Sequence, residues 1–332
     1  MKRSFQLAVL AVAVLVSFPA FGIVCAGTTG NSTVTDSFVP GGGYVGVRGV
    51  GSAVYLGDGW ALTAAHVGGG TVTLGGLDYT VVAGSAVRLK DPDLGGNTDL
   101  VLMKLNPNET TGLLPPLPTL NIASTPVQAG AAIWMIGAGR SCGTVREYQV
   151  TQNPDETFTW NGTRSTWTLY TFDPKYPRKP YFDADGNRYA GEYAYGYTTV
   201  TSTPRVVRWG TNVVDADIRF LMTGYGWVNG FYTIFDDNGD PNEAQAASGD
   251  SGGGVFAADG TLLGIMLAAS IFPNQPDNTA IFGNASLVLD LSYYLPQILA
   301  IAPELAVPEP ATLTMLLATS VFVVLRKRRA VT

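Results

Sequence analysis

The chain contains a single histidine, His66, and a glycine-rich serine turn, residues 248–254, that lies far after it. Glycine permits tight turns and close approach, so Ser251 can present its hydroxyl outward, while the N–H groups of Gly249 and Ser251 face a developing negative charge. A serine hydroxyl is a weak nucleophile until a neighbouring base takes its proton. An imidazole base can only be His66, so the fold must bring residues 66 and 251 together. The other interpretation is an ordinary Gly/Ser/Asp surface turn.

The third partner of such a site is an acid that orients the imidazole. Asp99 opens the apolar run Leu100–Leu105, as expected for an acid at the start of a buried strand. Asp91 and Asp93 are alternatives, but they flank a Pro/Gly turn and no strand follows them directly. We therefore predict that Asp99 is the acid.

Chain order discriminates between the folds that use these three residue types. Gly249–Gly253 also fits the G-x-S-x-G elbow of α/β-hydrolases, but that fold places its histidine after the serine. A subtilisin-type order needs an essential aspartate before His66, and neither Asp36 nor Asp58 lies in a recognisable motif. The order histidine, aspartate, serine is that of chymotrypsin.

Three segments resemble those of trypsin-like serine proteases: Leu62–His66, Asp99–Leu105 and Ser248–Phe256. The looser resemblance covers residues 44–290. It implies an all-β, chymotrypsin-like fold of two antiparallel six-stranded β-barrels with the catalytic cleft between them. It also implies an endopeptidase that hydrolyses protein or peptide substrates through an acyl-enzyme. Its catalytic residues would be His66, Asp99 and Ser251, with the oxyanion hole at Gly249 and Ser251. No metal or organic cofactor is expected.

The same resemblance indicates the substrate pocket. Gln245, six residues before the serine, corresponds to the pocket base, and Ala268 and Ala269 correspond to its wall. Gln245 carries no charge, so we expect weak cleavage after Lys or Arg and a preference for small or medium uncharged residues.

Strand-like runs occur on both sides of a proline-rich stretch, residues 106–126, which we interpret as the crossing between the barrels. The runs before and after it are residues 44–67, 71–74, 79–82, 86–90 and 100–105, then 131–139, 205–214, 231–235 and 261–269.

An insertion at about residues 144–204 holds 13 of the 35 aromatic residues. It is either a cover over the cleft that binds substrate or a peripheral hairpin. Two acidic loops, at residues 183–187 and 236–240, look calcium-like but lack the glycine position and final glutamate of an EF-hand. We expect acidic hairpin turns there.

The two ends have the composition of targeting segments. Residues 1–26 resemble a signal peptide, with a basic start and a short apolar run. Cleavage after Ala26 is one possibility. Cleavage after Gly22 would create an Ile23-Val24 terminus, which resembles that of activated trypsin-like enzymes, whose ammonium pairs with the acid before the serine, here Asp250. With residues 1–26 as the signal peptide, the protease domain is expected at residues 27–300.

Residues 301–332 contain Val-Pro-Glu-Pro at 307–310, an apolar stretch at 311–325 and the basic cluster 326–329. This combination resembles a PEP-CTERM sorting signal, which implies transient inner-membrane anchoring and processing by an exosortase near the Pro-Glu-Pro. A plain tail anchor is the alternative. We therefore expect an exported protein at the cell surface or outside the cell.

The charge distribution argues against nucleic acid as a partner. Residues 27–310 carry 14 basic and 26 acidic residues, a net charge of −12, whereas nucleic-acid binding depends on basic patches that neutralise phosphates. The competing functional class is a surface binding or adhesion module that retains the protease fold with weak or no catalysis.

Overall fold

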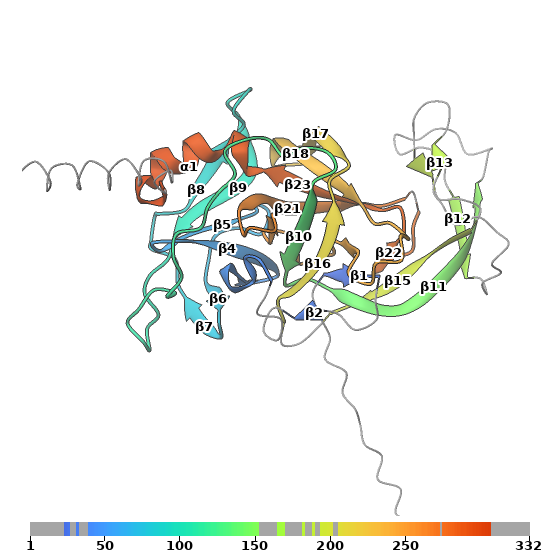
Figure 1. Ribbon diagram of the computed structural model, residues 1–332, viewed down its shortest axis with the longest axis horizontal. Helices are drawn as coiled ribbons and strands as arrows, with labels where there is room; N and C mark the ends of the chain where they lie inside the picture. Colours follow the sequence, from blue (N-terminus) through green and yellow to red (C-terminus); the bar gives the residue numbers. More distant parts are fainter. Residues whose placement is uncertain are drawn as a thin grey trace, which may run out of the picture.

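The computed structural model of this chain is mostly β-structure (Figure 1). The residues it describes are 23–26, 31–32, 39–152, 165–169, 181–182, 188–189, 193–201, 205–272 and 274–306. The signal-peptide region before residue 23, the acidic loop 183–187 and the predicted sorting segment after residue 306 lie outside them.

The first half of the chain forms a seven-stranded antiparallel sheet in the order β7-β6-β3-β4-β5-β9-β8. Its strands are β3 (Val45–Arg48), β4 (Gly51–Gly57), β5 (Trp60–Thr63), β6 (Val72–Leu74), β7 (Leu77–Tyr79), β8 (Val87–Lys90) and β9 (Asn97–Lys104). The central strands β4 and β5 are buried throughout. This is why their sequences read as nearly continuous small and apolar runs rather than as alternating ones.

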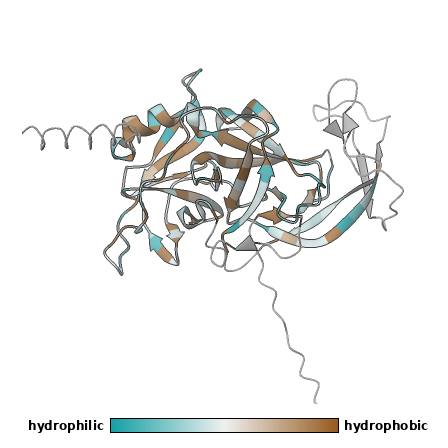
Figure 2. Cartoon of the chain, in the orientation of Figure 1, coloured by the Kyte–Doolittle hydropathy of each residue, from teal (hydrophilic) through white to brown (hydrophobic). Residues whose placement is uncertain are grey.

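The second half forms an eight-stranded sheet in the order β17-β18-β23-β21-β20-β10-β16-β2. Its strands are β2 (Asn31–Ser32), β10 (Ala132–Gly137), β16 (Arg208–Val213), β17 (Ala216–Met222), β18 (Gly226–Ile234), β20 (Gly254–Phe256), β21 (Leu262–Ser270) and β23 (Ala285–Asp290). One hydrophobic cluster contains buried side chains of both sheets, among them Leu62 and Leu100 of the first and Ile265 and Leu289 of the second. The two sheets therefore share a core (Figure 2).

The proline-rich crossing is attached to both sheets by backbone hydrogen bonds. The N–H of Leu120 donates to Leu56 in the first sheet, and the N–H of Ala123 donates to Leu262 in the second. The chain then returns from the second sheet through α1 (Leu295–Ile301) and a 3-10 turn, η3 (Pro303–Leu305). Glu304 of this turn accepts a hydrogen bond from Trp60 of the first sheet, at 2.6 Å.

The aromatic-rich insertion extends to one side as a third sheet, seen at the right of Figure 1. Its strand order is β12-β11-β15-β22, with bounds Ser165–Leu169, Ser141–Gln152, Tyr193–Val200 and Thr279–Ile281. A short pair, β13 (Tyr181–Phe182) with β14 (Arg188–Tyr189), completes its described part. The insertion is thus built on a long hairpin, which is joined to the body through β22.

A last pair of strands attaches the N-terminal segment to the loop before the serine. β1 (Val24–Cys25) pairs with β19 (Ala244–Gln245). Ile23, Val24 and Cys25 are buried.

The prediction of an all-β, antiparallel, chymotrypsin-like fold is confirmed. The sheets contain seven and eight strands where six each were expected. In the second sheet the unforeseen strands β2 and β17 form the two edges, whereas β18 overlaps the predicted strand at residues 231–235. The packed body continues to residue 306, past the expected boundary at 300, because Leu305 is buried. Within the described residues, no helix has the length and apolar character needed to cross a membrane.

Candidate active site

His66 lies in the turn that follows β5. The carbonyl of Ala64 accepts hydrogen bonds from the N–H groups of Val67 and Gly68, which closes the turn. Ala64 is buried, while the His66 side chain retains 24% exposure. The imidazole is therefore fixed at its base and accessible at its outer edge.

Asp99 lies in β9, the neighbour of β5, and its carboxylate is completely buried. It accepts two hydrogen bonds from His66, from the backbone N–H at 2.9 Å and from Nδ1 at 2.7 Å. An ionised carboxylate only accepts, so the proton of this bond resides on Nδ1. The neutral ring then presents the Nε2 lone pair, as a general base requires.

The alternative acids are engaged elsewhere. Arg219 of β17 donates to Asp91 at 2.7 Å and also pairs with Asp93. This cluster joins the loop between β8 and β9 to the second sheet, and neither of its acids contacts His66. Of the three candidate aspartates, the structure brings Asp99 to the histidine.

Ser251 lies in a turn between β19 and β20, with positive φ angles at Gly249 (99°) and Gly252 (86°) that favour glycine. Its Oγ donates to the carbonyl of Leu267 in β21, at 3.0 Å. No hydrogen bond joins Ser251 to His66 among the residues described. The two segments are nevertheless neighbours, since a Cβ placed on Gly51 would touch both Val67 and the Ser251 carbonyl.

Two hydrogen bonds fix the backbone on either side of Gly249. Ser248 O accepts from the N–H of Arg140 at 2.9 Å, and Gly249 O accepts from Ser52 Oγ at 3.0 Å. In a trans peptide the N–H points opposite to the carbonyl, so the Gly249 N–H is directed away from Arg140. Neither this N–H nor that of Ser251 donates to any acceptor in the described part of the chain.

Asp250 is buried directly beneath this turn. Its carboxyl group accepts from the N–H groups of Gly139 at 2.7 Å and Ala247 at 2.8 Å, and also from the N–H of Ile23. Burial raises the pKa of Asp250 to about 7, although these hydrogen bonds and the charge of Arg205 oppose the rise. The N-terminal segment thus meets the acid that precedes the serine.

The three residues assigned to the substrate pocket differ in their burial. Gln245 is buried, and its Oε1 makes no hydrogen bond among the described residues. Ala268 is partly buried and Ala269 is exposed, in the strand beyond Leu267. A register shift between Met266 and Ala268 leaves Leu267 as a bulge, which places its carbonyl near Ser251.

Sequence reasoning did not single out Tyr225, which lies at the tip of the β17–β18 hairpin. Its ring meets the His66 ring edge-on, with centroids 5.7 Å apart. Arg88 lies over the same ring at 5.3 Å and donates to the Tyr225 carbonyl at 2.6 Å. The contact joins residues from different sheets, and no local sequence pattern indicates it.

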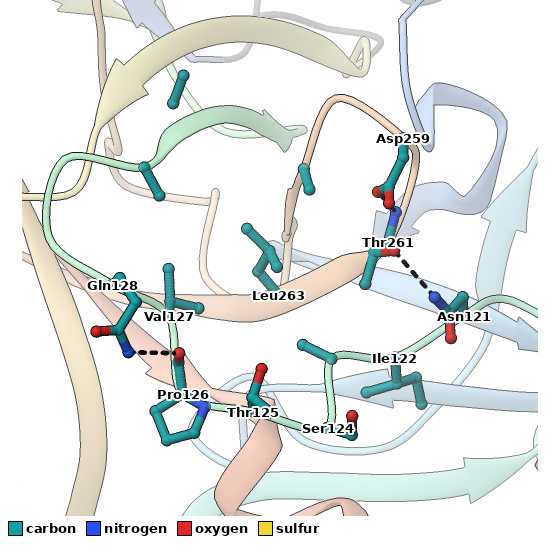
Figure 3. Close-up of a pocket in the computed structure, with 14 residues that line it drawn as sticks. Asn121, Ile122, Ser124, Thr125, Pro126, Val127, Gln128, Asp259, Thr261 and Leu263 are labelled. Carbon is teal, nitrogen blue, oxygen red and sulfur yellow. Dashed lines mark hydrogen bonds between the residues drawn. The ribbon is translucent and has the colours of Figure 1, made fainter.

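Two other features lie away from this site. A pocket between the crossing and the β20–β21 turn is lined by Asn121, Pro126, Asp259 and Leu263 among others, and by none of the predicted site residues (Figure 3). The acidic loop 236–240 is closed by its own hydrogen bonds, with Glu243 accepting from Asp236 N and Asn238 Nδ2. No cluster of three or more metal-ligating side chains occurs among the described residues.

Two antiparallel sheets with a shared core, an acid-bound histidine on one and a glycine-flanked serine on the other define the class of chymotrypsin-like folds. Residues 34–168 match the family model described as Trypsin. The matched stretch contains His66 and Asp99 and ends before Ser251. The match covers less than half of the chain, and the fold is chymotrypsin-like.

Several solved structures are similar to this chain. The inactive form of the Rv3671c protease from M. tuberculosis is 16% identical over 81% of this chain and 93% of its own, with a TM-score of 0.40. The HtrA-type protease AlgW with a decapeptide is 18% identical over 76% and 52%, with a TM-score of 0.38. A mutant of human heparin binding protein (CAP37) is 13% identical over 85% and 98%, with a TM-score of 0.44. A search of curated protein sequences found no match.

Proposed function

We propose that this protein is an exported serine endopeptidase that hydrolyses peptide bonds through an acyl-enzyme. The observation that carries the proposal is the double hydrogen bond from His66 to the buried carboxylate of Asp99. A carboxylate buried without charge compensation is costly, so its placement against the only histidine has a functional explanation. It fixes the tautomer and stabilises the imidazolium that forms when a proton is accepted.

In this proposal Ser251 is the nucleophile. For this step its Oγ would leave Leu267 O and donate to His66 Nε2. Attack on the substrate carbonyl transfers the proton to His66, which then gives it to the leaving amine. Water repeats the sequence to release the acyl group.

The outward N–H groups of Gly249 and Ser251 would receive the oxyanion. Ser52 and Arg140 support this role, because their hydrogen bonds to the two neighbouring carbonyls keep the Gly249 N–H turned outward. A donor of this kind contributes about 3 kcal/mol to transition-state stabilisation in comparable enzymes.

The pocket supports the expected preference for small or medium uncharged residues before the cut bond. Gln245 supplies a buried amide with a free Oε1 acceptor instead of a carboxylate, so it cannot form an ion pair with a substrate Lys or Arg. Ala268 and Ala269 leave a wall without an aromatic surface.

Cleavage of the signal peptide after Gly22 would supply the N-terminal ammonium that the site of activated trypsin-like enzymes contains. The burial of Ile23, Val24 and Cys25 and their pairing with β19 favour this position over cleavage after Ala26, which would remove them. The freed Ile23 ammonium would meet the Asp250 carboxylate that its N–H already contacts. The same maturation scheme includes the C-terminal segment, which we propose is a PEP-CTERM signal that anchors the chain in the membrane until an exosortase removes it.

A protease-like binding module is the second candidate, and the hydrogen bond from Ser251 Oγ to Leu267 O instead of His66 is the observation that favours it. Labelling with a fluorophosphonate separates the two, because this reagent modifies only an activated serine. We expect labelling of the wild-type protein and none of Ser251→Ala. A folded, processed wild-type protein that stays unlabelled would favour the binding module.

A further inference from the structure

Arg205 lies directly beside the turn that holds Gly249. A Cβ added to Gly249 would lie 2.8 Å from Nη1 and 3.1 Å from Nη2 of this arginine. The guanidinium therefore lies in contact with the face of Gly249 where other residues carry their Cβ. It is anchored there by Nη1, which donates to Val50 O at 2.5 Å and to Ala138 O at 3.3 Å.

The position of Arg205 relative to Ser251 indicates which part of a substrate would contact it, the part before the cut bond or the part after it. The acyl part of a substrate would lie along β21, where Leu267 contacts Ser251 and Ala268 and Ala269 follow. Val50 belongs to the β3–β4 turn, on the other side of the serine, where Ser52 N donates to Ser251 O at 2.8 Å. Arg205 thus lies where the leaving part of the substrate passes.

The anchoring leaves part of the guanidinium available. Both hydrogen bonds leave from Nη1, and Nη2 donates to no acceptor in the described part of the chain. The guanidinium groups of Arg48 and Arg140 are instead bound to Gly69 O and to Asn278.

We propose that Arg205 binds a carboxylate in the leaving part of the substrate, within the first two residues after the cut bond. The proposal rests on the proposed protease function and adds a specificity to it. The carboxylate has two possible sources, an Asp or Glu side chain at these positions or the free C-terminus of a short substrate. A guanidinium matches either through charge-assisted N–H···O bonds.

A different role would be to compensate the buried Asp250. Burial raises the pKa of Asp250 and the charge of Arg205 opposes that rise, so the two groups interact. A purely compensating arginine would affect all substrates equally, whereas an arginine that binds substrate would discriminate between a carboxylate and its amide. This difference decides the design of the test.

The experiment compares quenched fluorescent peptides that differ only in Asp or Asn at the first or second position after the cut bond. The processed wild-type protein should cleave the Asp peptide with a kcat/KM about tenfold higher. Arg205→Gln should bring this ratio close to one, and Arg205→Lys should retain part of it. Arg146→Gln is the matched control, because it removes the same charge from an exposed site on β11, and it should leave the ratio unchanged.

A second pair of peptides ends at these positions with either a free carboxylate or an amide. A preference confined to this pair identifies the C-terminus as the source, and a preference confined to the first pair identifies the side chain. Ratios near one for both pairs in the wild type, or an equal loss on both members of a pair in Arg205→Gln, would overturn the proposal.

Two further measurements separate this proposal from the protease function itself. A nitrophenyl ester has no peptide after the cut bond, so its hydrolysis by the wild-type protein and by Arg146→Gln reports the protease function without carboxylate recognition. If no substrate is cleaved by any variant, the affinities of Ser251→Ala for the Asp and Asn peptides still test carboxylate recognition. Equal affinities for the two peptides would refute it.

Discussion

At the scale of single residues, the proposed chemistry depends on one histidine that has no substitute elsewhere in the chain. Ser251→Ala and His66→Ala should each lower kcat by roughly a millionfold, and the double variant should lose little more, because the residues act as a unit. Asp99→Asn should cost about 10⁴-fold, since an amide that donates to Nδ1 would favour the wrong tautomer. Single-turnover kinetics on an activated ester would measure all four variants, and near-normal hydrolysis by His66→Ala would exclude the mechanism.

Some residues of this site could be predicted from the sequence, and others could not. Asp99 was identified because the acid opens an apolar run, and the structure places it against His66. Tyr225 and Arg205 were not identified. Tyr225 contacts His66 of the other sheet, and Arg205 contacts Gly249, which is 44 residues away in sequence. An isolated tyrosine or arginine in sequence carries no sign of such a contact.

At the scale of elements, the tip of the β17–β18 hairpin is docked against the strand that carries Asp99. Thr98 Oγ1 donates to Trp227 O at 2.8 Å, and Gly226 approaches Asn97 so closely that an added Cβ would lie 1.9 Å from its carbonyl oxygen. The first strand of this hairpin, β17, was not predicted, because its residues 216–222 alternate between partly buried and exposed positions and lack a strong apolar pattern, whereas β18 overlaps the predicted strand at residues 231–235. The positive φ of Gly226, 99°, adds to the constraint.

We predict that Gly226→Ala destabilises the protein by about 2–4 kcal/mol, through overpacking and backbone strain combined. It should also lower kcat, because displacement of Asn97 disturbs Asp99 in the same strand. Gly224→Ala is the control in the same turn. Its φ is also positive, 79°, but an added Cβ would meet nothing within 4 Å, so it should cost about 1 kcal/mol. Denaturant unfolding and ester hydrolysis of both variants test this, and equal effects would refute the docking argument.

The N-terminal element gives a prediction about pH. In the unprocessed chain Ile23 offers only an N–H, and burial raises the pKa of Asp250 to about 7. A raised pKa favours the protonated carboxyl in the fold, so this contribution to stability is complete below about pH 4 and is lost as pH rises through about 7. The melting temperature of the unprocessed chain should therefore fall across this range.

A chain that begins at Ile23 should show a smaller fall, because its ammonium stabilises the ionised Asp250. Glu243 titrates in the same window, since burial raises its pKa to about 7 as well. Asp250→Asn and Glu243→Gln in the unprocessed chain separate the two contributions. If Asp250→Asn leaves the pH dependence unchanged, Asp250 is not its source.

At the scale of the whole molecule, the order of the three site residues was enough to predict the fold, whereas sheet size was not. The short strand β2 and the strand β17 enlarge the second sheet at its edges without any strong local pattern. The packed end of the body was also placed too early, since Glu304 reaches Trp60 and Lys104 of the first sheet. A boundary defined by such long-range contacts is not visible in composition.

The last prediction concerns maturation of the whole chain. The body ends at Leu305, which is buried, and the Pro-Glu-Pro of residues 308–310 follows within a few residues. Cleavage beside this motif would therefore remove the apolar segment without cutting into the packed fold. We expect mass spectrometry of the exported protein to find a chain that begins at Ile23 and lacks residues 311–332. A variant with the 326–329 basic cluster replaced by glutamines should keep its tail, because without these charges the end of the segment is no longer held in the cytoplasm and the segment is not positioned for cleavage. A wild-type surface protein with an intact tail would instead indicate a permanent anchor.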